Sequence, residues 1–244
     1  MPGAPELLVT CEHGGNDIPP QYRALFADSR ALLAGHAGYD AGALCLARTL
    51  SLELGAPLIA SEVSRLLVDL NRSQGRRGLF SCLTRNLPPG ERRRILAAYY
   101  LPHRTAVAQA VAANRAQGKT TLHVAAHTFT PVLGGVVRAV DAGLLYDPAR
   151  PREAAVCARW KEILHALAPG LAVRRNAPYR GATDGLATWL RSVHPESAYL
   201  GVELELNQKF AADAPAWARL CMLVTRSLRQ AVAAHWDLRP GPGF

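Results

Sequence analysis

Two histidines of this chain stand directly after apolar segments with the length and composition of buried strands. His13 follows residues 7–11 and precedes two glycines, and His127 follows residues 120–126. Ligands of open α/β sheets bind in the crevice beyond the carboxyl ends of the strands. Imidazole is a common zinc ligand, so this placement predicts a divalent metal site there. His123 shares a face with His127 but would lie about 13 Å from it along the strand, so we interpret it as structural.

A third apolar segment, residues 200–206, carries two carboxylates, Glu203 and Glu205. Because they are two residues apart on a strand, they share one face. A carboxylate in a buried strand needs a metal, an arginine or a proton. Beside a metal, it can also help to activate water. Solvation on an edge strand is the alternative, but the apolar residues around both carboxylates argue against it.

Two further polar motifs have both a structural and a functional interpretation. Asp40 stands just before a predicted helix, where aspartate is a favoured N-cap, although its carboxylate is also a potential metal ligand. Asn71 and Arg72 are adjacent, and together they offer an amide and a bidentate guanidinium to a carboxylate. A turn stabilised by Asp69 and Asn71 is the structural alternative.

The elements that must position these residues alternate between strands and helices. Strands are predicted at residues 7–11, 57–61, 66–70, 120–126, 143–146, 171–174 and 200–206. Helices are predicted at residues 40–54, 89–116 with a bend at Pro102, 152–167 and 215–235. This alternation predicts an α/β fold, a three-layer α/β/α sandwich with a mostly parallel mixed sheet. No segment resembles a linker, so a single domain over residues 1–244 is predicted.

Composition narrows the class of protein. Hydrophobic residues make up 49% of the 244 residues, and no apolar run approaches the roughly 20 residues of a membrane span. The first residues lack the basic and apolar regions of a secretory signal, so a cytoplasmic protein is expected. The five cysteines form no CxxC pair, which favours buried thiols in a reducing compartment. Cys11, close to His13, is the one thiol to weigh as a nucleophile.

The formal net charge of +9 comes mostly from short clusters of arginine. Such a balance suits nucleic acid, but no zinc finger, RNA-binding aromatic strand or long basic tail accompanies the clusters. A small anionic substrate accounts for a basic site equally well. Neither a nucleic-acid partner nor a membrane partner is expected, and the sequence makes no prediction of the oligomeric state.

Taken together, these motifs resemble the N-formylglutamate amidohydrolase family. The resemblance runs through most of the chain, and the order and spacing of its short motifs carry it. The matching segments are residues 11–19, 38–42, 69–73, 127–131, 176–181 and 203–208. That family is similar in fold to the zinc carboxypeptidases and to aspartoacylase-type deacylases.

The resemblance implies a zinc hydrolase that cleaves an amide on the nitrogen of an amino acid, such as N-formyl-L-glutamate. His13 and His127 match the two metal histidines. Asn16 stands where the carboxypeptidase group has its glutamate ligand, so Asp40 is the best substitute carboxylate. The alternatives for this third ligand are Glu12, Asn16 and Asp17.

The resemblance also assigns the groups around the metal. Glu205 matches the catalytic glutamate, while Asn71 and Arg72 match the pair that holds the substrate carboxylate. Arg72 is also predicted to contribute to catalysis by fixing the scissile bond over the metal, and Arg180 is a second anion-binding candidate. Ala125 replaces an aspartate that the family often has, so the support for His127 must come from elsewhere.

Two other functions compete with this prediction. The first is a zinc deacylase or carboxypeptidase-like hydrolase acting on another N-acyl amino acid or peptide. The second, from a different class, is a metal-free basic protein that binds nucleic acid, which would show salt-dependent affinity for oligonucleotides.

Overall fold

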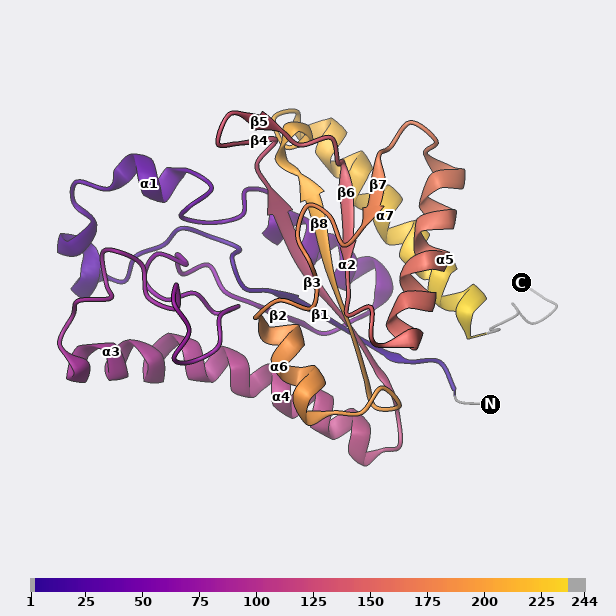
Figure 1. Ribbon diagram of the computed structural model, residues 1–244, viewed down its shortest axis with the longest axis horizontal. Helices are drawn as coiled ribbons and strands as arrows, with labels where there is room; N and C mark the ends of the chain where they lie inside the picture. The colour runs from indigo at the N-terminus through magenta and orange to yellow at the C-terminus, as the bar shows by residue number, and fades with distance from the viewer. Residues whose placement is uncertain (1–2, 237–244) are drawn as a thin grey trace.

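A six-stranded sheet forms the centre of the computed structural model, which describes residues 3–236 (Figure 1). Its strand order is β2-β1-β3-β8-β6-β7, and every neighbouring pair is parallel except β8 with β6. The strands are β1 (Glu6–Cys11), β2 (Leu58–Ala60), β3 (Thr121–Phe129), β6 (Ala142–Leu145), β7 (Val173–Arg175) and β8 (Tyr199–Asn207). The sheet is therefore mixed and mostly parallel, as predicted.

Helices cover both faces of this sheet. One face packs against α2 (Ala43–Leu54), α5 (Pro151–Leu167) and α7 (Ala214–His235). The other face packs against α4 (Leu101–Ala116) and α6 (Leu186–Val193), which lie side by side beneath the sheet in Figure 1. The predicted three-layer architecture is thus confirmed. The predicted termini, residues 1 and 244, lie outside the described residues, and the single domain stays a prediction.

Strand alternation places the polar residues of the two central strands on one face. In β3, Val124 and Ala126 belong to the core beneath α2, α5 and α7, so His123 and His127 point to the opposite face. The parallel register of β3 and β8 pairs His127 with Glu205. These two side chains therefore neighbour each other at the end of the sheet where both strands finish.

The predicted strand at residues 66–70 is wrong. This segment forms turns outside the sheet, and Leu66, Leu67, Val68 and Leu70 are buried in a separate apolar cluster. That cluster includes Tyr22 and Phe26 of η1 (Pro20–Phe26) and Ile95 of α3 (Pro89–Ile95). A short apolar run does not reveal whether its partner is a sheet or a group of helices and loops.

The long predicted helix at residues 89–116 is present, with a change of geometry near its middle. A π-helical segment, η2 (Leu96–Tyr100), joins α3 to α4, directly before Pro102. Proline lacks the N–H that an α-helix needs, and a wider turn is one way to accommodate its absence.

Four smaller elements and α6 were not predicted from the sequence. The smaller elements are α1 (Arg30–Ala34), β4 (Val132–Leu133), β5 (Val136–Val137) and η3 (Gln208–Phe210). Among the described helices, none combines the length and hydropathy needed to cross a membrane.

Candidate metal centre

Three buried side chains bring potential metal ligands together at the carboxyl end of the sheet. Asp40 Oδ2 lies 3.4 Å from His13 Nδ1 and 2.9 Å from His127 Nδ1. One ligand atom of each residue lies within 4.8 Å of the others. Two imidazole nitrogens and one carboxylate oxygen in this arrangement form a donor set that suits zinc.

The local backbone fixes Asp40 against His13. The N–H of Asp40 donates to the carbonyl of His13 at 2.9 Å, which joins the loop before α2 to the turn after β1. Asp40 does not cap α2, because Gly42 is the N-cap residue. Gly42 has a φ of 85°, and a Cβ there would lie 2.9 Å from the indole of Trp217. The predicted capping role is therefore wrong, and the Asp40 carboxylate is free to face the histidines.

Two further carboxylates hold the imidazole rings from behind. His13 Nε2 lies 2.7 Å from Asp69 Oδ1. His127 Nε2 lies 3.2 Å from Glu12 Oε2, while the other oxygen of Glu12 lies 3.4 Å from His103 Nε2. In both histidines Nδ1 is left facing Asp40. Outer carboxylates of this kind orient metal-binding imidazoles and strengthen them as ligands, so Glu12 supplies the support that Ala125 cannot give His127.

Arg65 connects the two aspartates of this cluster. Its Nη2 donates to Asp69 Oδ2 at 2.8 Å, and its Nη1 to Asp40 Oδ1 at 3.4 Å. The guanidinium thus holds the oxygen of each aspartate that does not face a histidine. Sequence reasoning did not select Arg65, although its position four residues before Asp69 in a buried segment was an available signal.

The charge state of the cluster is the test of whether a cation fits. Burial lowers the pKa of His13, as does Arg65, but Asp69 and Asp40 outweigh them and raise it. Burial also lowers the pKa of His127, yet the hydrogen bond to Asp40 and the charge of Glu12 at 3.2 Å raise it well above its ordinary value. Within the described part of the chain, His13 Nδ1 has no hydrogen-bond partner. The carboxylates thus attract positive charge to the point where the ligand atoms meet, and a divalent ion fits.

Glu205 lies beside this centre on β8. Its side chain is buried, and its Oε2 has no hydrogen-bond partner among the described residues. Burial raises the pKa of Glu205; His127 opposes the shift, and Asp40 and Glu203 add to it, so that the pKa is about 8. A carboxyl whose pKa lies near neutral pH is suited to accept and to donate a proton.

The seven predicted site residues all line one pocket of about 430 Å³. They are His13, Asp40, Asn71, Arg72, His127, Arg180 and Glu205. Asn71 Oδ1 accepts from the N–H of Leu186 at 2.7 Å, and Arg72 Nη1 donates to the carbonyl of Asp184 at 3.5 Å. Arg180 is exposed at the pocket wall. Arg65, Arg72 and Arg180 thus place positive charge in a pocket that also holds buried carboxylates.

The alternatives for the third ligand lie in other places. Glu12 is behind His127, Asn16 Nδ2 donates to the carbonyl of Leu33, and Asp17 is exposed outside the pocket. The thiol of Cys11 is buried, and burial raises its pKa to about 12, which makes it a poor nucleophile.

The three-layer fold and the buried His-Asp-His cluster define a hydrolase-like α/β protein with a candidate metal site. The model of the N-formylglutamate amidohydrolase family matches residues 5–212. The chain therefore belongs to the N-formylglutamate amidohydrolase family.

Solved structures agree with this assignment. The gene product Atu2144 from Agrobacterium tumefaciens is 29% identical, with a TM-score of 0.82 over 94% of this chain and 91% of that one. N-formylglutamate amidohydrolase from Ralstonia eutropha JMP134 is 16% identical, with a TM-score of 0.67 over 93% of this chain and 95% of that one, and shows the same fold. A search of curated protein sequences finds no match.

Proposed function

We propose that this protein is a zinc-dependent amidohydrolase that removes the N-acyl group, such as formyl, from an anionic amino acid such as N-formyl-L-glutamate. The observation that carries the proposal is the convergence of His13, Asp40 and His127 beside Glu205 in a pocket with arginines on its wall. Family membership supports the reaction class.

His13 Nδ1, Asp40 Oδ2 and His127 Nδ1 would hold the ion. When bound, zinc polarises an acyl carbonyl and makes water more acidic. Glu205 accepts a proton from the attacking water and delivers it to the nitrogen of the leaving amine. Asp69 and Glu12 keep the imidazoles oriented throughout.

Arg72 and Asn71 would bind a carboxylate of the substrate, with Arg180 as a second anion-binding group. A bidentate contact from a guanidinium fixes the orientation of a carboxylate as well as its position. Holding the scissile amide against the reacting groups removes much of the entropic cost of the reaction.

Elemental analysis and a substrate panel test the proposal together. The purified protein, dialysed against zinc, should contain one zinc ion per chain, and His13→Ala or His127→Ala should lose most of it. Formyl, acetyl and succinyl amino acids, with acidic or neutral side chains, then identify the acyl group and the amino acid. A protein without stoichiometric metal, or without hydrolysis of any member of the panel, would contradict the proposal.

A further inference from the structure

The positive charge of the chain is concentrated in one short segment away from the metal centre. Residues 76–94 contain six arginines and one glutamate, an excess of five out of the formal net charge of +9. The segment contains no lysine. Arginine presents a planar fork of donors that matches phosphate and carboxylate oxygens, and it stacks on flat rings. The composition therefore points to recognition of an anion rather than to solubility alone.

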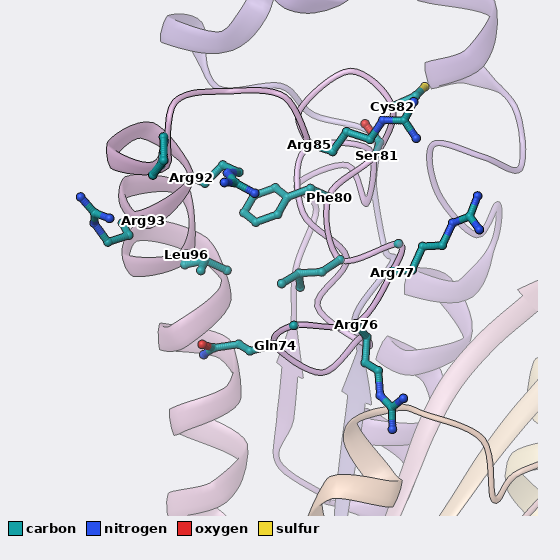
Figure 2. A pocket seen from close by; sticks show the side chains of 14 residues that line it. Gln74, Arg76, Arg77, Phe80, Ser81, Cys82, Arg85, Arg92, Arg93 and Leu96 are labelled. Atoms are coloured by element: carbon teal, nitrogen blue, oxygen red, sulfur yellow. The ribbon is translucent and has the colours of Figure 1, made fainter.

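This segment folds into a groove that we call the arginine groove, between the loop at residues 74–82 and the helical residues 89–96 (Figure 2). The cavity has a volume of about 610 Å³, within the range of small-molecule sites. It shares no lining residue with the pocket of the metal centre. Leu79, Phe80 and Leu96 give it an apolar centre, and no carboxylate lines it.

The cations of the arginine groove have no partners of their own. Arg76, Arg77, Arg85 and Arg93 are exposed. Within residues 3–236, none of their side chains makes a hydrogen bond or an ion pair. Their neighbour Arg94, by contrast, pairs with Glu91. Unpaired guanidiniums around one cavity repel each other, and an anion would relieve that repulsion.

The centre of the groove holds a half-buried aromatic ring, Phe80, and a half-buried guanidinium, Arg92. The guanidinium carbon of Arg92 lies 6.0 Å from the centroid of the Phe80 ring, and Arg92 Nε is buried with no partner among the described residues. Figure 2 shows Arg92 and Phe80 together between the loop and the helix, while Arg76, Arg77 and Arg93 extend outward from the edge. A ring and a guanidinium thus lie at the centre of the groove, and further guanidiniums lie at its edge.

We propose that the arginine groove binds a nucleoside diphosphate. The base would stack on the surface formed by Phe80 and Arg92, because aromatic and guanidinium faces both attract flat rings. The phosphate oxygens would accept charge-assisted, bidentate hydrogen bonds from the guanidiniums at the edge of the groove. The apolar centre disfavours a bare inorganic anion, which would leave that surface uncovered, and the volume of the cavity suits a small molecule.

Calorimetric titration of the zinc-loaded full chain tests the proposal, with ADP, pyrophosphate and adenosine as probes. ADP should bind at least about tenfold more tightly than either pyrophosphate, which has charge without a ring, or adenosine, which has a ring without charge. The double variant Arg76→Gln with Arg77→Gln should lower the affinity for ADP by about tenfold or more. The matched control is Arg219→Gln with Arg226→Gln, two exposed arginines of α7. This double variant should change the affinity for ADP by less than about twofold.

A second variant separates stacking from charge. Phe80→Leu keeps the apolar centre but removes the aromatic ring. The affinity for ADP should therefore fall about fivefold or more, while the affinity for pyrophosphate stays unchanged. Cysteine alkylation gives an independent readout, because Cys82 lines the groove and the exposed Cys45 lies on α2. ADP should slow the alkylation of Cys82 and leave that of Cys45 unchanged.

Four results would overturn the proposal: no binding of ADP at millimolar concentration, equal affinity for ADP and pyrophosphate, equal losses in the α7 control, or alkylation of Cys82 at the same rate with ADP present. Tighter binding of single-stranded oligonucleotides than of ADP would also overturn it, since the surface would then serve a polymer. Each readout is independent of the amidohydrolase reaction.

Discussion

His127 and His123 lie on the same face of β3, four residues apart, and they have opposite chemistry. His127, near the end of the strand, has Asp40 on one nitrogen and Glu12 on the other, and its pKa is raised well above the ordinary value. His123, in the middle of the sheet, has the hydroxyls of Thr10 and Tyr199 at 2.7 Å each, and burial lowers its pKa to about 4. The two residues are of the same type and lie on the same face of the strand. Their different partners therefore make His127 a candidate ligand and His123 a neutral part of the core.

The strand end favours the first outcome because loops can reach it. Glu12 and Asp40 come from segments that follow β1, whereas Thr10 and Tyr199 belong to the neighbouring strands β1 and β8. A position within a sheet can be surrounded only by what the strands and the covering helices bring. Loops bring carboxylates to the ends of the strands, and other parts of the chain hold them in place, so ionised side chains can be accommodated there.

The largest effect is expected from Glu205, the carboxyl beside His127 that we propose to transfer protons. Glu205→Gln should lower kcat by about 10²–10⁴, the usual contribution of general acid–base catalysis. The metal content should stay stoichiometric, because Glu205 is not one of the proposed ligands. Glu203→Gln is the matched control one step along the same strand face; if it is the crippling change and Glu205→Gln is mild, the assignment of the carboxylates is reversed.

The next prediction concerns the neutral histidine. Because the pKa of His123 is lowered in the folded state, its contribution to stability is complete above its unfolded pKa and is lost as the pH falls. Between pH 7 and pH 5, wild type should lose about 2 kcal/mol more of its free energy of unfolding than His123→Asn does, for a folded pKa of about 4. Urea denaturation at the two pH values measures this, and equal losses would show that His123 is not held neutral.

A third test weakens the support of His13 without touching a proposed ligand. Asp69→Asn keeps the shape of the side chain but removes the charge that faces Nε2 and Arg65. Zinc affinity, measured by competition with a chelator, should fall about 10–100-fold. Asp28→Asn, an exposed aspartate, is the control that should leave the affinity unchanged. Unchanged affinity in Asp69→Asn would mean that the orientation of His13 does not depend on this contact.

The smallest effect should fall on substrate selection. Arg72→Lys replaces a fork of donors by a point charge, and kcat/KM should fall about 10–100-fold. The loss should be larger for a substrate acid than for its amide analogue, which never had the contact. Equal losses on both would assign Arg72 to the fold or to the transition state instead.

Alternation of strands and helices predicted the layers of the fold, strand ends pointed to His13 and His127, and the resemblance to the family implied the roles of the other five site residues. The sequence did not predict Arg65 or the contact of Glu12 with His127, since these residues meet groups from distant segments of the chain. Asp69 shows the limit well. The expected turn is present, with Asp69 Oδ1 accepting from the N–H of Asn71 at 3.0 Å, but the same oxygen also faces His13. The strand predicted at residues 66–70 failed because its apolar side chains are buried against helices and loops.

The contact between Gly42 and Trp217 has a consequence for the order in which the protein is made. The turn that carries Asp40 is covered by an indole from α7, near the end of the described chain. As the chain leaves the ribosome, His13, Asp40 and His127 all emerge long before this cover. We therefore expect the turn that carries Asp40 to be fixed only once α7 has docked, so that a chain that stops before residue 217 should bind zinc less tightly than the full chain.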